Sequence, residues 1–360
     1  MRKLFVAGGQ QKVHRSPVTS TEDWCQYHKG IILDVDAYTG VCQSAIEYQS
    51  PPNVASHKRE SLFKTGAVER ERLYLCTQTE VMIYALPSLE LVQYISLPCF
   101  NDLHHVRPMP DGSLLVANTG LDMVLLMTPS GSVLREWHVQ GGNAWTQFSK
   151  DIDYRCVDTK PHAAHPNHVF CIGDEIWATR FHRKDAVCVT RSGRRIAIDV
   201  GLPHDGVLHD GMVYFTTVNG NVVIANPVTL QVEDIIDLNS IYGPEVQLGW
   251  CRGIVIDAGG VWIGFSRLRS TRFRENVKWA IQGFKTILPT RIARFDLGKR
   301  ECLAEIDLER HGLNAVYGIL PTIDAIAIDT AIGGETVSGR KESFVGALEG
   351  NVVRPATVVT

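Results

Sequence analysis

Residues 105–118 read HVRPMPDGSLLVAN: a short apolar segment that starts with a histidine, a Pro-Asp-Gly turn, and a second apolar segment that ends in asparagine. The same pattern returns at residues 168–180, 206–217 and 253–265. Turn residues between two short runs of strand-forming residues predict a β-hairpin. The chain therefore contains one kind of hairpin that is repeated along the sequence.

The repeated hairpin is half of a longer unit. Each of the first three hairpins is followed by two more apolar segments with a turn between them, at residues 124–127 and 132–137, 186–190 and 194–199, and 222–225 and 232–238. Residues 60–97 contain an earlier unit, whose clearest strands are 72–77, 81–85 and 91–97. Four antiparallel strands that recur about every 40 residues are typical of the blades of a β-propeller.

These units predict an all-β protein, a six-bladed β-propeller of four-stranded antiparallel blades closed by strands from both termini. The closing blade combines residues 314–319 with 31–35 and 41–48, and its second strand is either 4–8 or 325–329. We expect residues 1–330 to form this single domain and residues 331–360 to form a poorly ordered tail. Two smaller β-sandwiches are the alternative, but they give the hairpins no reason to share polar residues at the same positions.

Composition excludes several classes of protein. The 360-residue chain has 36 basic and 39 acidic residues and a net charge of −3, which disfavours nucleic-acid binding. No apolar run is long enough to span a membrane, and the first residues lack the apolar core of a signal peptide, so we expect a cytoplasmic protein with no membrane span. The nine cysteines never form a C-x-x-C pair, and no glycine-rich phosphate motif is present, so neither a zinc ribbon nor a nucleotide cofactor is expected.

Propeller geometry locates the candidate site. The first strand of a blade begins, and its second strand ends, on the same side of the ring and near the central channel. The side chains that we place there as catalytic groups are His105, His165, Arg180 and His204, and those that we place there as substrate-binding groups are His104, Asn118, Asn167, His168, Arg252 and Arg267. A shift of one residue in strand register decides which member of a neighbouring pair faces the channel, so the pattern does not rank His104 against His105.

Histidines from three successive blades on one side of the ring predict a binding or catalytic site. Arginine binds sulfate, phosphate or carboxylate in a bidentate manner, and a histidine beside it acts as a nucleophile or as a general acid or base. These residue types favour an enzyme that acts on a small polar or anionic substrate. Histidines also bind zinc, iron and manganese, so a divalent metal that serves a lyase, hydrolase or oxygenase is the open alternative.

Residues 101–220 also resemble a known family. The runs His104-His105-Val106, His165-Pro166-Asn167 and Pro203-His204-Asp205 are similar to motifs of the bacterial arylsulfate sulfotransferases, as are Arg180 and Asn219 after them. In that six-bladed propeller family, a histidine transiently carries the sulfuryl group of a phenolic sulfate. The resemblance implies that His204 is the nucleophile, that His165 and Arg180 hold the sulfuryl oxygens, and that His105 completes the site.

Long connections on the side of these histidines predict a cover over the site. The connections are residues 9–29, 49–61, 139–164 and 267–290, and loops of this length are usually functional or disordered. The 267–290 insertion has apolar residues at helical spacing beside several basic ones. This suits either a lid over an anionic ligand or a solvated amphipathic helix. A non-catalytic platform that binds a protein or glycan partner is the remaining alternative.

Overall fold

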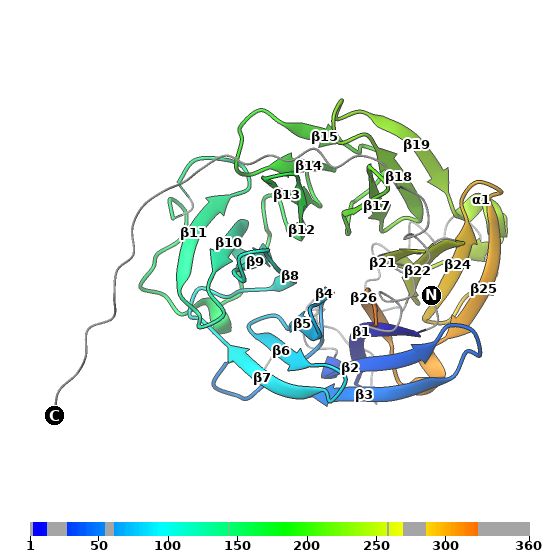
Figure 1. The fold of residues 1–360 in the computed structure, drawn as a ribbon, viewed down its shortest axis with the longest axis horizontal. Coiled ribbons are helices and arrows are strands. Elements are labelled where there is room, and N and C mark those ends of the chain that lie inside the picture. The colour runs from blue at the N-terminus through cyan, green and yellow to red at the C-terminus, as the bar shows by residue number, and fades with distance from the viewer. Residues whose placement is uncertain are drawn as a thin grey trace, which may run out of the picture.

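The computed structural model describes residues 3–12, 27–54, 61–143, 145–257, 259–268 and 286–322. These residues form six four-stranded antiparallel sheets, which surround a central axis as the blades of a propeller (Figure 1). The prediction of a six-bladed, all-β propeller is confirmed. Within the described ranges, α1 (Asn239–Tyr242) is the only α-helix.

Each repeated hairpin supplies the two inner strands of one blade. The blades, from the inside of the ring outwards, are β4 (Gly66–Glu69), β5 (Arg72–Cys76), β6 (Val81–Ala85) and β7 (Glu90–Ile95); β8 (Leu103–Pro108), β9 (Leu114–Asn118), β10 (Met123–Met127) and β11 (Val133–His138); and β12 (Pro166–Ile172), β13 (Glu175–Arg180), β14 (Asp185–Cys188) and β15 (Arg195–Ala197). They continue with β16 (Val207–His209), β17 (Met212–Thr217), β18 (Asn221–Ala225) and β19 (Val232–Asp237); and β21 (Trp250–Asp257), β22 (Gly260–Ser266), β24 (Arg291–Asp296) and β25 (Glu301–Asp307).

The sixth blade joins the two ends of the chain. Its strands are β26 (Ala315–Pro321), β1 (Lys3–Gln11), β2 (Tyr27–Asp36) and β3 (Cys42–Tyr48). The N-terminal segment is therefore the second strand, because β1 pairs with both β26 and β2, while residues 325–329 lie outside the described part of the chain. At Gly8, β1 comes so close to β26 that an added Cβ would overlap the carbonyl oxygen of Ala315.

The core lies between the blades. Leu114 and Leu115 of β9 point to opposite faces and both are fully buried, because one packs in a cluster with the preceding blade and the other in a cluster with the following blade. Trp177 and Trp262 are likewise buried between blades. Strands that are buried on both faces are apolar along their whole length rather than at alternate positions, which explains the short continuous apolar runs of the sequence.

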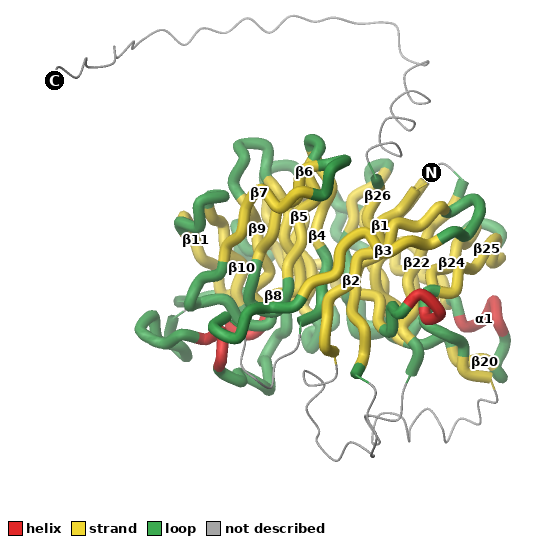
Figure 2. The backbone as a smooth tube through the Cα atoms, turned by 90° about the horizontal axis from the view of Figure 1, so that it is seen from below, coloured by secondary structure: helices red, strands yellow, loops and turns green. Residues whose placement is uncertain are grey.

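Of the long connections, the structure describes mainly residues 139–164, and residues 13–26 and 55–60 lie outside the described ranges. Residues 139–164 pack where β8 begins, since the side-chain amide of Asn101 donates to the carbonyl oxygens of Tyr154 and Val157, over 2.6 and 2.8 Å. Figure 2 shows α1 and β20 (Val246–Gln247) together on one side of the ring. Most of the 267–290 insertion and all of residues 331–360 fall outside the described ranges. Among the described residues, no helix has the length and apolar character needed to cross a bilayer.

Candidate functional site

Three blades bring histidines together at the end of the channel where β8 begins. The ring centroids of His104 and His165 lie 4.9 Å apart, and those of His104 and His204 lie 6.3 Å apart. His104 and His204 are buried, and His165 is partly exposed. The structure thus unites three of the histidines that the sequence singles out.

His105 and His168 form a second layer of the site. Their imidazoles stack, with ring centroids 3.7 Å apart. A bulge between Leu103 and His105 in the pairing of β8 with β9 places the neighbouring histidines in different layers. His104 and His105 therefore both lie near the channel, in different layers, so the strand register excludes neither of them.

Backbone groups of two neighbouring blades fix the tautomer of His105. The amide N–H of Val169 donates to its Nδ1 over 3.1 Å, and its Nε2 lies 3.1 Å from the carbonyl oxygen of Gly66. Because Nδ1 accepts, Nε2 carries the hydrogen and donates to Gly66, so the ring is neutral. Burial lowers the pKa of His105 to about 3. With both nitrogens engaged, His105 links three inner strands in the described structure.

His204 is arranged differently, because one of its nitrogens has no partner. Nδ1 lies 3.3 Å from Oδ1 of Asp205, and the buried Nε2 has no hydrogen-bond partner among the described residues. Asp205 is itself fixed, since its Oδ2 accepts from the hydroxyl of Thr216 and from the amide of Gly253. Burial lowers the pKa of His204. A carboxylate on Nδ1 and a bare Nε2 suit an imidazole that acts as a base or a nucleophile.

Tyr317 of β26 lies between two cations. The ammonium of Lys64 is 4.3 Å and the guanidinium carbon of Arg252 is 4.4 Å from the centroid of its ring. Burial alone raises the pKa of this phenol, but the two cations and a hydrogen bond from Arg252 lower it to about 8. His104 and His204 border the same ring. Tyr317 therefore combines a half-buried position with a pKa near neutrality, and a shifted pKa of this kind is common at functional sites.

Lys64 connects the phenol to the histidine group. Its ammonium lies 3.3 Å from Nε2 of His104 and 3.6 Å from Oδ1 of Asp102. All three residues are buried. Although burial by itself raises the pKa of Asp102, the ammonium of Lys64 holds it below its usual range. The ion pair compensates for the burial of both charges, which is otherwise costly.

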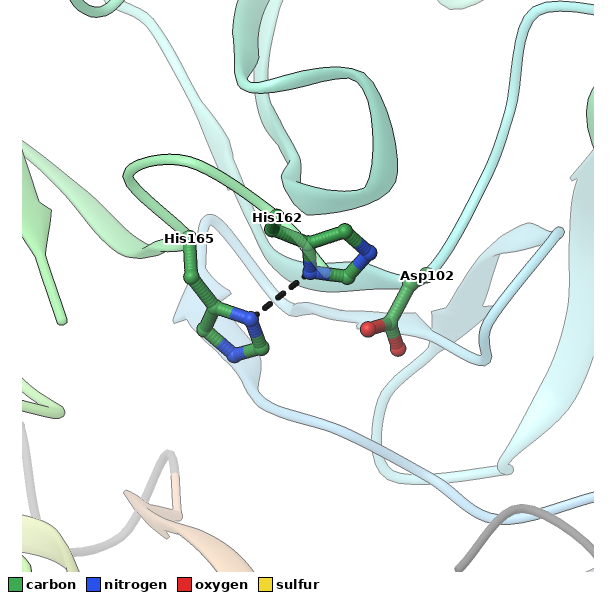
Figure 3. Close-up of side chains that lie close together, drawn as sticks. All are labelled: Asp102, His162 and His165. Carbon is green, nitrogen blue, oxygen red and sulfur yellow. Dashed lines mark hydrogen bonds between the residues drawn. The ribbon is translucent and has the colours of Figure 1, made fainter. Parts of the chain in front are cut away.

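Three side chains of types that can bind a metal lie together near His104 (Figure 3). Asp102, His162 and His165 each offer one ligand atom, and these atoms lie within 4.8 Å of one another. The Nδ1 atoms of the two histidines are 2.8 Å apart, and the carboxylate of Asp102 points towards the same space (Figure 3). Two imidazoles and one carboxylate are a donor set that divalent transition metals accept.

Two residues of this group have a strained backbone. Asp102 has φ of 47° and His165 has φ of 58°, both in the left-handed region that residues other than glycine rarely adopt. The carboxylate of Asp122 stabilises the second of these conformations, because it accepts from the amides of Ala163, Ala164 and His165. Strain of this kind clusters at functional sites.

Four other predicted site residues make different contacts. Arg180 forms a bidentate ion pair with Asp185 and donates to the carbonyl oxygen of Val139. Arg267 is exposed and pairs with Glu309. The amide of Asn118 bonds the backbone of residues 99 and 101, and that of Asn167 donates to Pro203 while its Oδ1 has no described partner. Arg252 and Lys64 therefore lie against Tyr317 beside the histidines, whereas Arg180 is tied to its own blade.

Sequence reasoning misses Lys64 and His162. Lys64 precedes the four-residue strand β4, which is too short to show a periodic pattern, so the start of this blade is not located. His162 lies inside the 139–164 connection, where no strand register applies. Its only signal is the spacing of three residues from His165, the i, i+3 spacing of many metal ligands.

A cavity of about 690 Å³ lies on the other side of the His105–His168 layer. Residues of all six inner strands line it, from His105, His168 and Asp205 in its depth to Glu69, His209 and Pro321 at the far ends of the strands. Its remaining walls are mainly apolar. The channel therefore has a polar end and an apolar end.

Comparisons with known proteins show a likeness of fold. No model of a known protein family matches the chain, and no curated protein matches it. A solved structure of a protein of unknown function from Bacteroides caccae has 15% identity and a TM-score of 0.57, over 90% of this chain and 100% of that one. A chain of a crystal structure of a nidogen/laminin complex has 9% identity and a TM-score of 0.53, over 88% of this chain and 97% of that one. At such identities the likeness shows a shared propeller fold.

Proposed function

We propose that the protein is an enzyme that binds a small anionic substrate at the polar end of the channel and transfers a group from it through His204. The observation that carries the proposal is the buried Nε2 of His204, which has no described hydrogen-bond partner while Nδ1 is held by Asp205. Such an arrangement leaves one lone pair for chemistry and a carboxylate to stabilise the cation that forms.

Lys64 and Arg252 supply the anion binding. Both lie against Tyr317, and both lie close enough to His204 to lower its pKa, after burial and against the effect of Asp205. Asp102 already pairs with Lys64, and a substrate oxyanion would bring a further negative charge to the two cations. In a site from which water is excluded, charge-assisted hydrogen bonds from ammonium and guanidinium groups are strong.

Sulfuryl transfer is the reaction that suits these groups and the sequence resemblance. Nε2 of His204 attacks the sulfur of an aryl sulfate, the bond from sulfur to the aryl oxygen breaks, and the leaving oxygen takes the proton of Tyr317. The oxygen of a hydroxyl acceptor then attacks the sulfur, the bond from sulfur to Nε2 of His204 breaks, and the hydroxyl proton goes to the phenolate of Tyr317, which restores both residues. A phenol with a pKa of about 8 is matched to this exchange, because it donates and accepts a proton near neutral pH.

The test has a binding arm and a turnover arm. Calorimetric titration with sulfate should show one site, and Lys64→Met and Arg252→Met should each weaken it at least tenfold. With 4-nitrophenyl sulfate and phenol as acceptor, release of 4-nitrophenolate should fall at least a hundredfold in His204→Ala. His138→Ala, on the outer strand β11, is the matched control and should leave both readings unchanged.

The two arms separate the parts of the proposal. Absence of sulfate binding would overturn the anion site. Sulfate binding without turnover of the aryl sulfate would reject the transfer step and leave a propeller that binds anionic groups of a partner.

A further inference from the structure

We infer that Asp102, His162 and His165 form a binding site for one divalent transition metal ion at the polar end of the channel. The inference goes beyond the proposed function, since it concerns different side chains and a different ligand. It rests on the positions of three groups that come from two segments, the one before β8 and the connection to β12 (Figure 3).

Two of the three ligand atoms already lie at a distance that one metal ion requires. Two nitrogens bound to the same metal at about 2.1 Å and at right angles lie about 3 Å apart. The Nδ1 atoms of His162 and His165 are 2.8 Å apart. The ligand atom of Asp102 lies within 4.8 Å of both, so rotation of the carboxylate brings an oxygen into reach.

Asp102 has an oxygen to offer. It is 1% exposed, and its Oδ1 accepts no hydrogen bond from the described residues. A buried carboxylate oxygen without a hydrogen-bond donor is costly, and the closest cation, Lys64, is 3.6 Å away. A metal ion bound to Oδ1 would satisfy this atom.

His162 is oriented by a second shell of contacts. The hydroxyl of Thr159 donates its hydrogen to Oδ1 of Asn101 over 3.0 Å. Because that hydrogen is already used, the hydroxyl oxygen of Thr159 accepts from Nε2 of His162, which is 3.3 Å away. With the hydrogen on Nε2, Nδ1 presents a lone pair to the space shared with Asp102 and His165. A histidine that donates its second N–H to an outer group is the usual arrangement around protein-bound metals.

The donor set selects the class of metal. Imidazole nitrogens suit zinc, iron, cobalt and manganese, whereas magnesium and calcium prefer an all-oxygen set. Three protein ligands leave positions open for water or a substrate oxygen. Lys64 competes with a bound cation for Asp102, so it lowers metal affinity and its removal should raise it.

The experiment uses the full chain after dialysis against a chelator. Calorimetric titration with Co²⁺ should show one site, with visible absorption of the bound ion as a second reading, and Mg²⁺ should show none. Asp102→Asn and His165→Ala should each weaken Co²⁺ binding at least a hundredfold. Thr159→Val should weaken it about tenfold to a hundredfold, as loss of an outer-shell partner does.

Two further variants make the result specific. His182 lies beside His165, with ring centroids 5.4 Å apart, but is not one of the three ligands, so His182→Ala is the matched control and should bind Co²⁺ as the wild type does. Lys64→Met should bind Co²⁺ more tightly and sulfate more weakly. These opposite changes separate failure of the metal site from failure of the anion site.

The inference is overturned if Co²⁺ binds no better than Mg²⁺, or if His182→Ala weakens binding as much as His165→Ala does. Asp102→Asn is nearly isosteric, and its thermal unfolding should show that the fold is kept. An unfolded His165→Ala variant would therefore leave the Asp102→Asn titration to decide.

Discussion

The imidazole of His105 stacks face to face on that of His168, with ring centroids 3.7 Å and ring planes 14° apart. Two imidazolium ions would repel each other strongly at this distance inside a protein. The backbone contacts of His105 hold one ring neutral, and burial lowers the pKa of both. The packing of β8 against β12 therefore requires uncharged rings.

This stacking predicts that acid destabilises the protein. An unfolded histidine titrates near pH 6.5, whereas the pKa of folded His105 is about 3. Between these values the unfolded chain binds more protons than the folded chain, so the free energy of unfolding falls as the pH is lowered below about 6.5. The contribution of the neutral His105 to stability is complete above that pH. Urea midpoints measured from pH 5 to 8 test this.

The matched control for acid destabilisation is His311→Gln. His311 is exposed in the turn after β25, so this variant should keep the wild-type dependence on pH. A urea midpoint that is the same at pH 5 and pH 8 in the wild type would contradict the prediction.

Tyr317 should be the first tyrosine to ionise. Its pKa is lowered to about 8, although burial opposes this, by Lys64 and Arg252. As the pH rises through 8, ultraviolet difference spectra should show one phenolate, and Tyr317→Phe should abolish it. Lys64→Met should move the step to higher pH, because it removes one of the cations that stabilise the phenolate.

Tyr84 provides the control for the phenolate titration. It is buried, and burial raises its pKa to about 12, so Tyr84→Phe should leave the step near pH 8 in place. A step that disappears in Tyr84→Phe and persists in Tyr317→Phe would show that the assignment is wrong.

Arg180 and Arg252 should respond differently to replacement by methionine. Arg180→Met breaks a bidentate pair with the buried Asp185, which also contacts Arg195, and should cost about 3 kcal/mol of stability without changing sulfate binding. Arg252→Met should weaken sulfate binding. Unfolding in urea and calorimetry with sulfate measure the two effects, and weaker sulfate binding in Arg180→Met would return Arg180 to the anion site.

The sequence predicts the fold well because every blade repeats the same local physics. The turn residues between apolar runs, as at Asp111-Gly112, locate each hairpin, and burial on both faces makes its strands continuously apolar. The choice between the two candidate second strands of the last blade depends on a pairing of β1 with β26 across more than 300 residues. Local patterns carry no information on such a pairing.

The candidate site is predicted only in part for a related reason. The histidines at the strand starts are found because the repeat fixes their positions. His162 and Lys64 lie outside any recognisable repeat, and only the folded chain brings them to Asp102 and Tyr317. Arg180 shows the opposite case. The repeat correctly places it at the end of a strand, but it does not predict the direction of its long side chain, which pairs with the carboxylate of Asp185 in the same sheet.

Closure of the ring should be sensitive to one methyl group. Gly8 lies where the pairing of β1 with β26 shifts register, and a Cβ there would overlap the carbonyl oxygen of Ala315. Gly8→Ala must push the two strands apart, which we expect to cost about 3 kcal/mol of stability. In the control Gly298→Ala, in the turn between β24 and β25, the closest atom to the new Cβ is 3.4 Å away, in the side chain of Asp296. Urea unfolding should show a lower midpoint for Gly8→Ala and an almost unchanged one for Gly298→Ala, whereas equal midpoints would mean that the contact between the terminal strands does not limit the stability of the ring.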